Sequence, residues 1–142
     1  MNFFKTNPVI GISTFRLYLL RIFYAMAVLM LGIDVWTEIF THEQSWAPLP
    51  GVAFSFWGAF SLLAIIGIAH PLKMLPLLLV QFTYKLIWLL IVAYPLWSAS
   101  QLAGDPAESL TRANAIGLVL DLLIIPWPYV FKHIVFTKTA NV

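Results

Sequence analysis

The chain contains no cysteine, and charged residues make up only 10% of its 142 residues. Without cysteine it can form no disulfide, no thiolate nucleophile and no zinc-thiolate or iron–sulfur site. A soluble domain usually carries about 25% charged residues, so this sequence has too few polar side chains to cover a water-soluble globule. The net charge of +2 is small and forms no basic stripe, and it does not indicate a nucleic-acid partner.

The sequence is instead rich in long apolar runs, since 61% of its residues are hydrophobic. A helix needs about 20 mostly apolar residues to cross about 30 Å of hydrocarbon. Hydrocarbon offers the backbone no hydrogen-bond partners, so segments this long and uniformly apolar cross it as helices. The predicted spans are residues 15–40, 52–70, 73–97 and 112–131. We therefore predict an all-α integral membrane protein, a four-helix antiparallel bundle that forms one transmembrane domain over residues 1–142.

The ends of these spans carry recognisable signals. Arg16 and Arg21 interrupt the first apolar run, which is also too long for a signal peptide, so we expect a retained helix with Thr14 as its N-cap. Residues 105–108, Asp-Pro-Ala-Glu, are typical of a helix start before the fourth span. Pro126 and Pro128 predict a kink or a stop near its end.

The distribution of basic residues predicts the orientation. Six lysines and arginines fall on one side of the predicted membrane: Lys5, Arg16, Arg21, Lys73, Lys132 and Lys138. The opposite side has only Arg112. Basic residues stay cytoplasmic, so both termini are predicted to be cytoplasmic, with the lipid bilayer as the first partner.

Three ionisable residues lie inside the predicted spans. Lys85 is near the middle of the third span, Asp121 near the middle of the fourth, and Asp34 in the outer third of the first. A charge at the centre of a lone helix costs about 2.5–3.5 kcal/mol. We therefore predict that Lys85 and Asp121 meet inside the bundle. A Lys85 amine directed toward the exterior would lie between Asp121 and Asp34.

Other polar and aromatic side chains accompany this group. Gln81 and Trp88 lie one turn either side of Lys85, and Tyr84 and Trp88 can stack at i,i+4. The predicted polar cluster is Asp34, Gln81, Tyr84, Lys85, Trp88 and Asp121. Two interpretations stay open: the cluster is a ligand-binding pocket with aromatic walls, or it is a set of polar contacts that holds packed helices together.

No catalytic residue, metal site or cofactor is predicted. The three histidines lie at span ends or in connections, and no phosphate-binding loop or serine–histidine pairing is present. Ser55-xxx-Ala59 and Ala113-xxx-Gly117 are small-xxx-small spacings, weak signals for close helix contact.

Three long stretches of the sequence resemble a known family. They are LRIFYAMAVLMLGIDVW, GVAFSFWGAFSLLAIIGIAHPLKMLPLLLVQFTYKLIWLL and AIGLVLDLLIIPWPYV. They resemble the BphX-like proteins, four-helix bacterial membrane proteins named from an aromatic-catabolism gene cluster. The leading Leu-Arg and later Gly of the first span are more distantly similar to the DoxX-like proteins, some of which are linked to quinone-coupled oxidoreductases. The resemblance implies a four-helix fold and the bacterial inner membrane, and it supplies no catalytic residue.

These observations lead to three hypotheses of function. The first is binding of a small amphiphile, quinone-like or aromatic, at the intramembrane polar cluster. The second is an accessory or structural subunit that docks on a larger membrane protein or on a second copy. The third is proton-linked transport with Asp34 and Asp121 as titrating groups, although transporters are usually longer and built from repeats. Binding or an accessory role is favoured over catalysis.

Overall fold

The computed structural model describes residues 4–6 and 11–136, and these residues form helices and no extended sheet. The elements are α1 (Thr14–Met26), the π-helical η1 (Ala27–Gly32), α2 (Ile33–Thr41), α3 (Pro48–Ala69), α4 (Leu75–Trp88), the π-helical η2 (Leu89–Ala93), α5 (Tyr94–Ser98), α6 (Ala107–Ile124), α7 (Trp127–Val130) and the π-helical η3 (Phe131–Val135). Three of the described helices are long and apolar enough to cross a membrane, or four if the broken pair α6 and α7–η3 is one span. The chain is thus an all-helical membrane protein.

The observed helices begin and end within a few residues of the predicted spans. The first runs without interruption from Thr14 to Thr41, and the third from Leu75 to Ser98. The N-cap of α1 is Ser13, and the prediction of Thr14 was wrong by one residue. Ser13 has an extended backbone, and its Oγ accepts a hydrogen bond from the Arg16 backbone N–H at 3.3 Å. A serine hydroxyl in that position satisfies one of the unpaired N–H groups at a helix start.

Both predicted proline signals mark helix ends in the structure, although the N-cap of α6 is Pro106 and the helix begins at Ala107, one residue later than the Asp-Pro-Ala-Glu pattern indicates. Before α6, the Asp105 side chain accepts a hydrogen bond from the Ala107 N–H at 2.7 Å, and Glu108 accepts one from the Gly104 N–H at 2.8 Å. After α6, the helix ends at Ile124 and resumes at Trp127. Pro126 and Pro128 have no backbone N–H to continue the helical hydrogen bonds, so the predicted break is confirmed.

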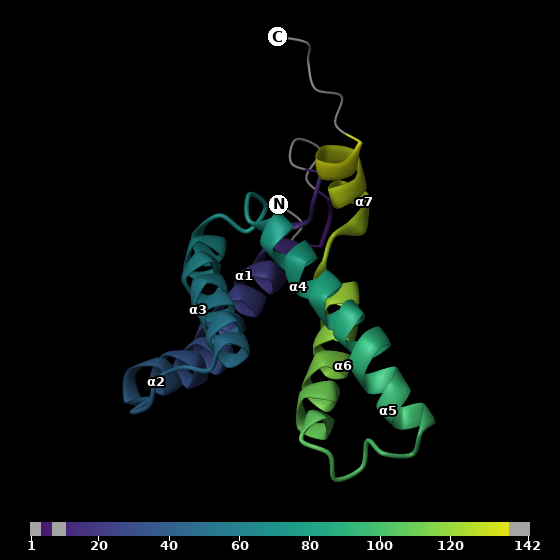
Figure 1. Ribbon diagram of the computed structural model, residues 1–142. Coiled ribbons are helices and arrows are strands. Elements are labelled where there is room, and N and C mark those ends of the chain that lie inside the picture. The colour runs from purple at the N-terminus through teal and green to yellow at the C-terminus, as the bar shows by residue number, and fades with distance from the viewer. Residues whose placement is uncertain (1–3, 7–10, 137–142) are drawn as a thin grey trace. The chain divides into compact units, whose positions relative to one another are not determined.

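The chain divides into two compact units. The first comprises residues 1–77 and 126–142, and the second comprises residues 78–125. In the first unit, α1, η1 and α2 pack along α3 (Figure 1). Tyr24 lies against Gly67, Gly32 against Ser61, and Trp36 against Gly58. Numbers rise along one helix as they fall along the other, so the two helices are antiparallel.

Small residues on α3 bring the two helices of the first unit together. A Cβ added at Gly67 would lie 2.5 Å from the Tyr24 ring, and one added at Gly32 would lie 3.3 Å from the Ser61 Cβ. Trp36 donates its indole N–H to the Ser61 Oγ at 2.9 Å, and Ser61 donates to the Gly58 carbonyl at 2.8 Å. Close approach and satisfied polar groups are the usual basis of helix association in membranes.

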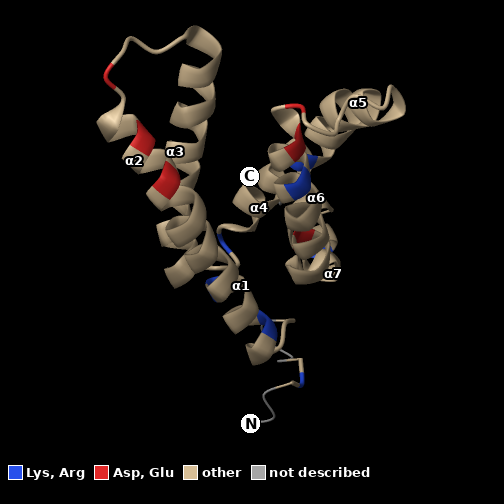
Figure 2. Ribbon diagram, turned by 90° about the horizontal axis from the view of Figure 1, so that it is seen from below, with Lys and Arg blue, Asp and Glu red and all other residues tan. Residues whose placement is uncertain are grey.

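Charges in the first unit separate by sign along the α1–α2 helix. Basic residues lie at the beginning of α1, and acidic residues lie on α2 and in the turn after it (Figure 2). The positive-inside rule places the basic end of such a helix on the cytoplasmic side of the membrane. Of the six basic residues used for the orientation, Lys138 lies outside the described residues.

The second unit is a helical hairpin in which α6 packs against α4 and the π-helical segment η2 (Figure 1). Residues 99–106 connect its two arms. Pro95, two residues after η2, has no N–H to donate to the Ile91 carbonyl. The α-helical hydrogen bonding is therefore interrupted within η2, at Ile91. The hairpin holds most of the predicted polar cluster.

Candidate functional site

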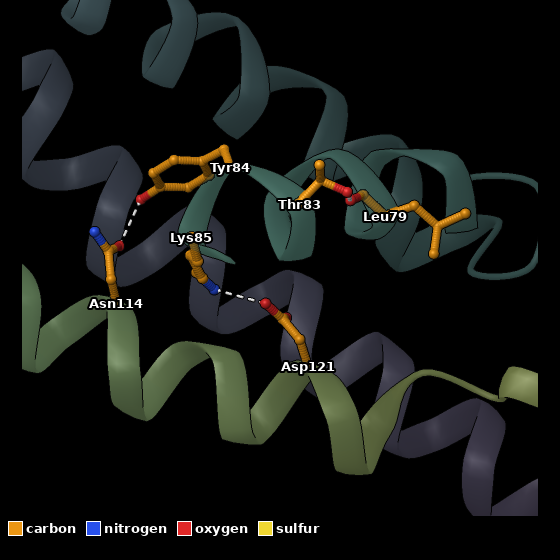
Figure 3. A network of polar contacts seen from close by, with 6 residues as sticks. All are labelled: Leu79, Thr83, Tyr84, Lys85, Asn114 and Asp121. Atoms are coloured by element: carbon orange, nitrogen blue, oxygen red, sulfur yellow. Dashed lines mark hydrogen bonds and ion pairs between the residues drawn. The ribbon is translucent and has the colours of Figure 1, made fainter. Parts of the chain in front are cut away.

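The structure brings Lys85 and Asp121 together in the second unit. The Lys85 Nζ lies 2.9 Å from the Asp121 Oδ2 (Figure 3). Lys85 is 6% exposed and Asp121 is fully buried. Separating two charges in this setting would leave each without water or a partner, so the pair holds α4 and α6 at a fixed register.

The Lys85 side chain points in the direction opposite to the one expected. Tyr84, its neighbour, bonds to Asn114, whereas Lys85 reaches Asp121, which lies about two turns further along α6. Because α4 and α6 are antiparallel, Lys85 leans toward the beginning of α4 (Figure 3). The Cα–Cβ bonds of a helix tilt toward its N-terminus, so a long side chain extends that way most easily. Lys85 therefore leans away from the end of α4 that is predicted to face the exterior.

Two aromatic side chains of the predicted cluster make polar contacts of their own. The Tyr84 hydroxyl donates to the Asn114 Oδ1 at 2.8 Å, and the Trp88 indole N–H donates to the Thr111 Oγ1 at 3.3 Å. Asn114 and Thr111 precede Asp121 by 7 and 10 residues, about 10 and 15 Å along α6. The polar groups of both rings therefore join α4 to α6 at positions outside the ion pair. Their role as walls of a pocket stays a prediction. Asn114, which is 6% exposed, was not among the predicted members of the cluster.

Gly117 makes room for the lysine. A Cβ added at Gly117 would lie 2.7 Å from the Lys85 Nζ and 2.8 Å from its Cε. The side chain of Lys85 thus crosses α6 at its one glycine before it meets Asp121 one turn later. The Ala113-xxx-Gly117 spacing was the sequence signal for this close approach.

Replacing Gly117 with alanine should weaken the hairpin because the added methyl group displaces the lysine amine from its partner. We expect the free energy of unfolding to fall by about 1–2 kcal/mol. In a Lys85→Met/Asp121→Leu background the same substitution should have little effect or stabilise α6, since alanine favours helix by up to about 1 kcal/mol. Denaturant unfolding of the four variants in detergent would measure this coupling, and equal losses in both backgrounds would contradict the proposed crossing.

Two buried oxygens of this site lack hydrogen-bond donors. They are the Asp121 Oδ1, on the carboxylate that pairs with Lys85, and the Gln81 Oε1. Gln81 lies one turn before Lys85 on the same face of α4, in the direction in which the lysine leans. A buried acceptor without a donor costs about 1–3 kcal/mol. The lysine ammonium has three donors, and one of them is directed at the Asp121 Oδ2. The unpaired Asp121 Oδ1 therefore lies on the same carboxylate that the lysine ammonium contacts.

Asp34 belongs to the first unit, and its place in the polar cluster stays a prediction. It lies in the first turn of α2 and is exposed. Polar residues follow it at helical spacing on one face of α2: Thr37, Glu38, Thr41 and His42. Glu38 and His42 contact each other at 3.0 Å, and among the described residues Asp34 has no ion-pair or hydrogen-bond partner. The face of α2 opposite this polar stripe carries Val35 and Ile39.

The first unit also has an apolar groove of about 450 Å³ between its two helices. It is lined by Val28, Ile33, Phe40, Leu62 and Ile65, with Gly32, Trp36 and Ser61 at its base. The Trp36 and Ser61 polar groups already bond to each other and to Gly58. The groove can accept a hydrocarbon chain, but it has no free polar group to orient a head group.

Known proteins provide no further guide to this site. Comparison with protein-family models, curated proteins and solved structures finds no match. Within the described residues, no group of three or more histidine, aspartate and glutamate side chains could hold a metal ion.

Proposed function

We propose that the protein binds a small amphiphile at the intramembrane site formed by Gln81, Lys85 and Asp121. The observation that carries this proposal is the pair of buried acceptors without donors beside a buried ammonium group. A membrane-dissolved molecule with a polar head would supply those donors from inside the bilayer. Its apolar part would remain among the apolar side chains of the helices.

The unsatisfied oxygens favour binding over a purely structural pair. A buried ion pair recovers its desolvation cost only when further hydrogen bonds satisfy the remaining lone pairs. Here Asp121 has one paired oxygen and one unpaired oxygen, although the neighbouring Tyr84 and Trp88 contacts are complete. Buried polar groups left incomplete in this way are uncommon, and intramembrane charges are functional by default.

Extraction in native lipid particles tests the proposal. We expect one small amphiphile to copurify with the wild type at near-stoichiometric amount, measured by mass spectrometry of the extracted lipid fraction. The Lys85→Met/Asp121→Leu variant removes both charges together, and it should lose that molecule while keeping its helical circular-dichroism spectrum. Thr83→Val is the matched control, because Thr83 is exposed and bonds only to the Leu79 carbonyl of its own helix. Equal recovery from all three proteins would refute the proposal.

A second candidate function is an accessory subunit of a larger membrane protein. The observation that favours it is the exposed Asp34 at the head of the polar stripe on α2. A carboxylate within a membrane span is costly to expose to lipid, and a basic residue on a neighbouring helix would reduce that cost. In the same extraction, a stoichiometric membrane protein lost in Asp34→Leu, with no bound amphiphile, would establish this candidate in place of the first.

We further propose that the protein resides in a bacterial inner membrane with both termini cytoplasmic, as expected of a BphX-like protein. The basic residues at the start of α1 and the acidic residues on α2 support this orientation. Fusing a reporter that is active only in the periplasm to either terminus should give no signal, and a signal from either fusion would reverse the assignment.

A further inference from the structure

The buried oxygens without donors in the second unit restrict the chemistry of a ligand that would satisfy them. Both orphan atoms, the Asp121 Oδ1 and the Gln81 Oε1, are acceptors. A carboxylate is acceptor-only, and the lysine ammonium is donor-only. A ligand that satisfies either oxygen must therefore carry a hydrogen-bond donor.

We infer that the ligand head carries a neutral hydroxyl group, as in a phenol or a hydroquinone, and that the corresponding carbonyl compound is bound more weakly. This inference rests on the proposed binding function and specifies its ligand class. One hydroxyl can donate to the Asp121 Oδ1 and accept from a free N–H of Lys85 through the same oxygen. A quinone carbonyl can only accept, so it would leave both orphan oxygens without donors.

Charge excludes the other simple head groups. The attraction of an ionic head to one member of the Lys85–Asp121 pair is offset by its repulsion from the other member. Lys85 and Asp121 neutralise each other at 2.9 Å, so the site as a whole offers no net charge to an ionic ligand. An uncharged donor also avoids the cost of carrying a charge into hydrocarbon.

The ligand must enter by moving a side chain, because neither orphan oxygen has accessible surface. The Lys85 amine is the movable part, since it lies at the end of a flexible chain that crosses Gly117. Helical side chains cover the turn that precedes them, so Lys85 lies over the turn that contains Gln81. A small displacement of the amine would therefore uncover the Asp121 carboxylate with which it pairs.

The experiment compares a hydroquinone with its own quinone. A benzohydroquinone and the matching benzoquinone, each with the same short alkyl tail, are titrated into lipid nanodiscs that contain the protein, under anaerobic conditions. Bound ligand is separated and quantified by chromatography, with empty nanodiscs as the blank. The hydroquinone should bind at least about tenfold more tightly than the quinone, since each unmade hydrogen bond to a buried group weakens binding.

Gln81→Leu tests the assignment of the acceptors without touching the ion pair. It removes one orphan oxygen, so the protein should fold as the wild type does. Because the hydroxyl donates to the Asp121 Oδ1, binding of the hydroquinone should stay within about twofold of the wild type. A severalfold loss would overturn the assignment of the donated hydrogen bond to Asp121. The dimethyl ether of the hydroquinone keeps its shape but has no donor, and it should bind no better than the quinone.

The outcomes separate this inference from the proposed function. Saturable binding of both forms with equal affinity, or tighter binding of the quinone, would overturn the hydroxyl-donor inference while leaving amphiphile binding in place. Binding of both forms no greater than to empty nanodiscs would overturn the inference for this ligand class, whereas the copurification experiment would still decide whether the site holds another amphiphile. A hydroquinone preference that survives in Lys85→Met/Asp121→Leu would place the binding elsewhere and also overturn the inference.

Discussion

Replacing Lys85 with methionine should lower the free energy of unfolding of the protein by about 3–5 kcal/mol, the largest effect we expect from any single substitution. The change leaves Asp121 fully buried without its partner. Asp121→Leu should cost a similar amount, because it leaves the ammonium group uncompensated. Reversible unfolding in mixed detergent micelles, followed by circular dichroism, would measure both losses.

The double variant Lys85→Met/Asp121→Leu should recover most of this loss. Buried ion pairs replaced by apolar residues of similar volume are often neutral or stabilising, so we expect the double variant to lie within about 1 kcal/mol of the wild type. Thr83→Val, on the exposed face of α4, should change stability by less than about 0.5 kcal/mol. Additive losses in the double variant would mean that the two residues do not stabilise each other in the membrane protein.

Replacing Gly67 with alanine should destabilise the first unit by about 1–3 kcal/mol or more. The added Cβ would lie 2.5 Å from the Cδ1 atom of Tyr24 and 2.6 Å from its Cγ. Tyr24 is fully buried, and its hydroxyl donates to the Pro71 carbonyl at 3.3 Å. The ring therefore has nowhere to move, and α3 must separate from α1.

Gly51→Ala on the same helix is the matched control for this prediction. Its added Cβ would approach no atom closer than 3.4 Å, at the Trp46 Cβ, so stability should stay the same or rise through helix propensity. In a Tyr24→Leu background the cost of Gly67→Ala should shrink, because a smaller and more flexible side chain would face the new methyl group. If Gly67→Ala is as harmless as Gly51→Ala in unfolding experiments, the two helices do not pack as closely as described.

Comparison of the predicted spans with the observed helices shows which features depend on local sequence. The apolar runs predicted each helix to within a few residues, because the length of an apolar run and the positions of proline are local properties. The break at Pro126 was predictable for the same reason, since a missing N–H interrupts any helix. The choice of Ser13 over Thr14 as the N-cap was not, because both side chains can cap and only the backbone conformation decides.

The candidate site was only partly predictable. Lys85 and Asp121 could be paired on paper because unpaired charges are costly at depth and consecutive helices are neighbours. The direction in which the Lys85 side chain extends could not be predicted. It depends on the rotation of α4 and α6 about their axes and on the space that Gly117 leaves for the lysine. The contacts of Tyr84 with Asn114 and of Trp88 with Thr111 likewise depend on packing.

The sequence by itself determined that this protein is helical, that it suits a bilayer, and that a lysine and an aspartate must find each other inside it. These conclusions follow from run length and charge, which do not depend on neighbours. Only the tertiary structure decided that Lys85 leans toward the beginning of α4, that it crosses α6 at a glycine, and that the Asp121 Oδ1 and Gln81 Oε1 are left without donors. Hydrogen bonding is directional over about 3 Å, and such distances are fixed by the rotation and register of packed helices.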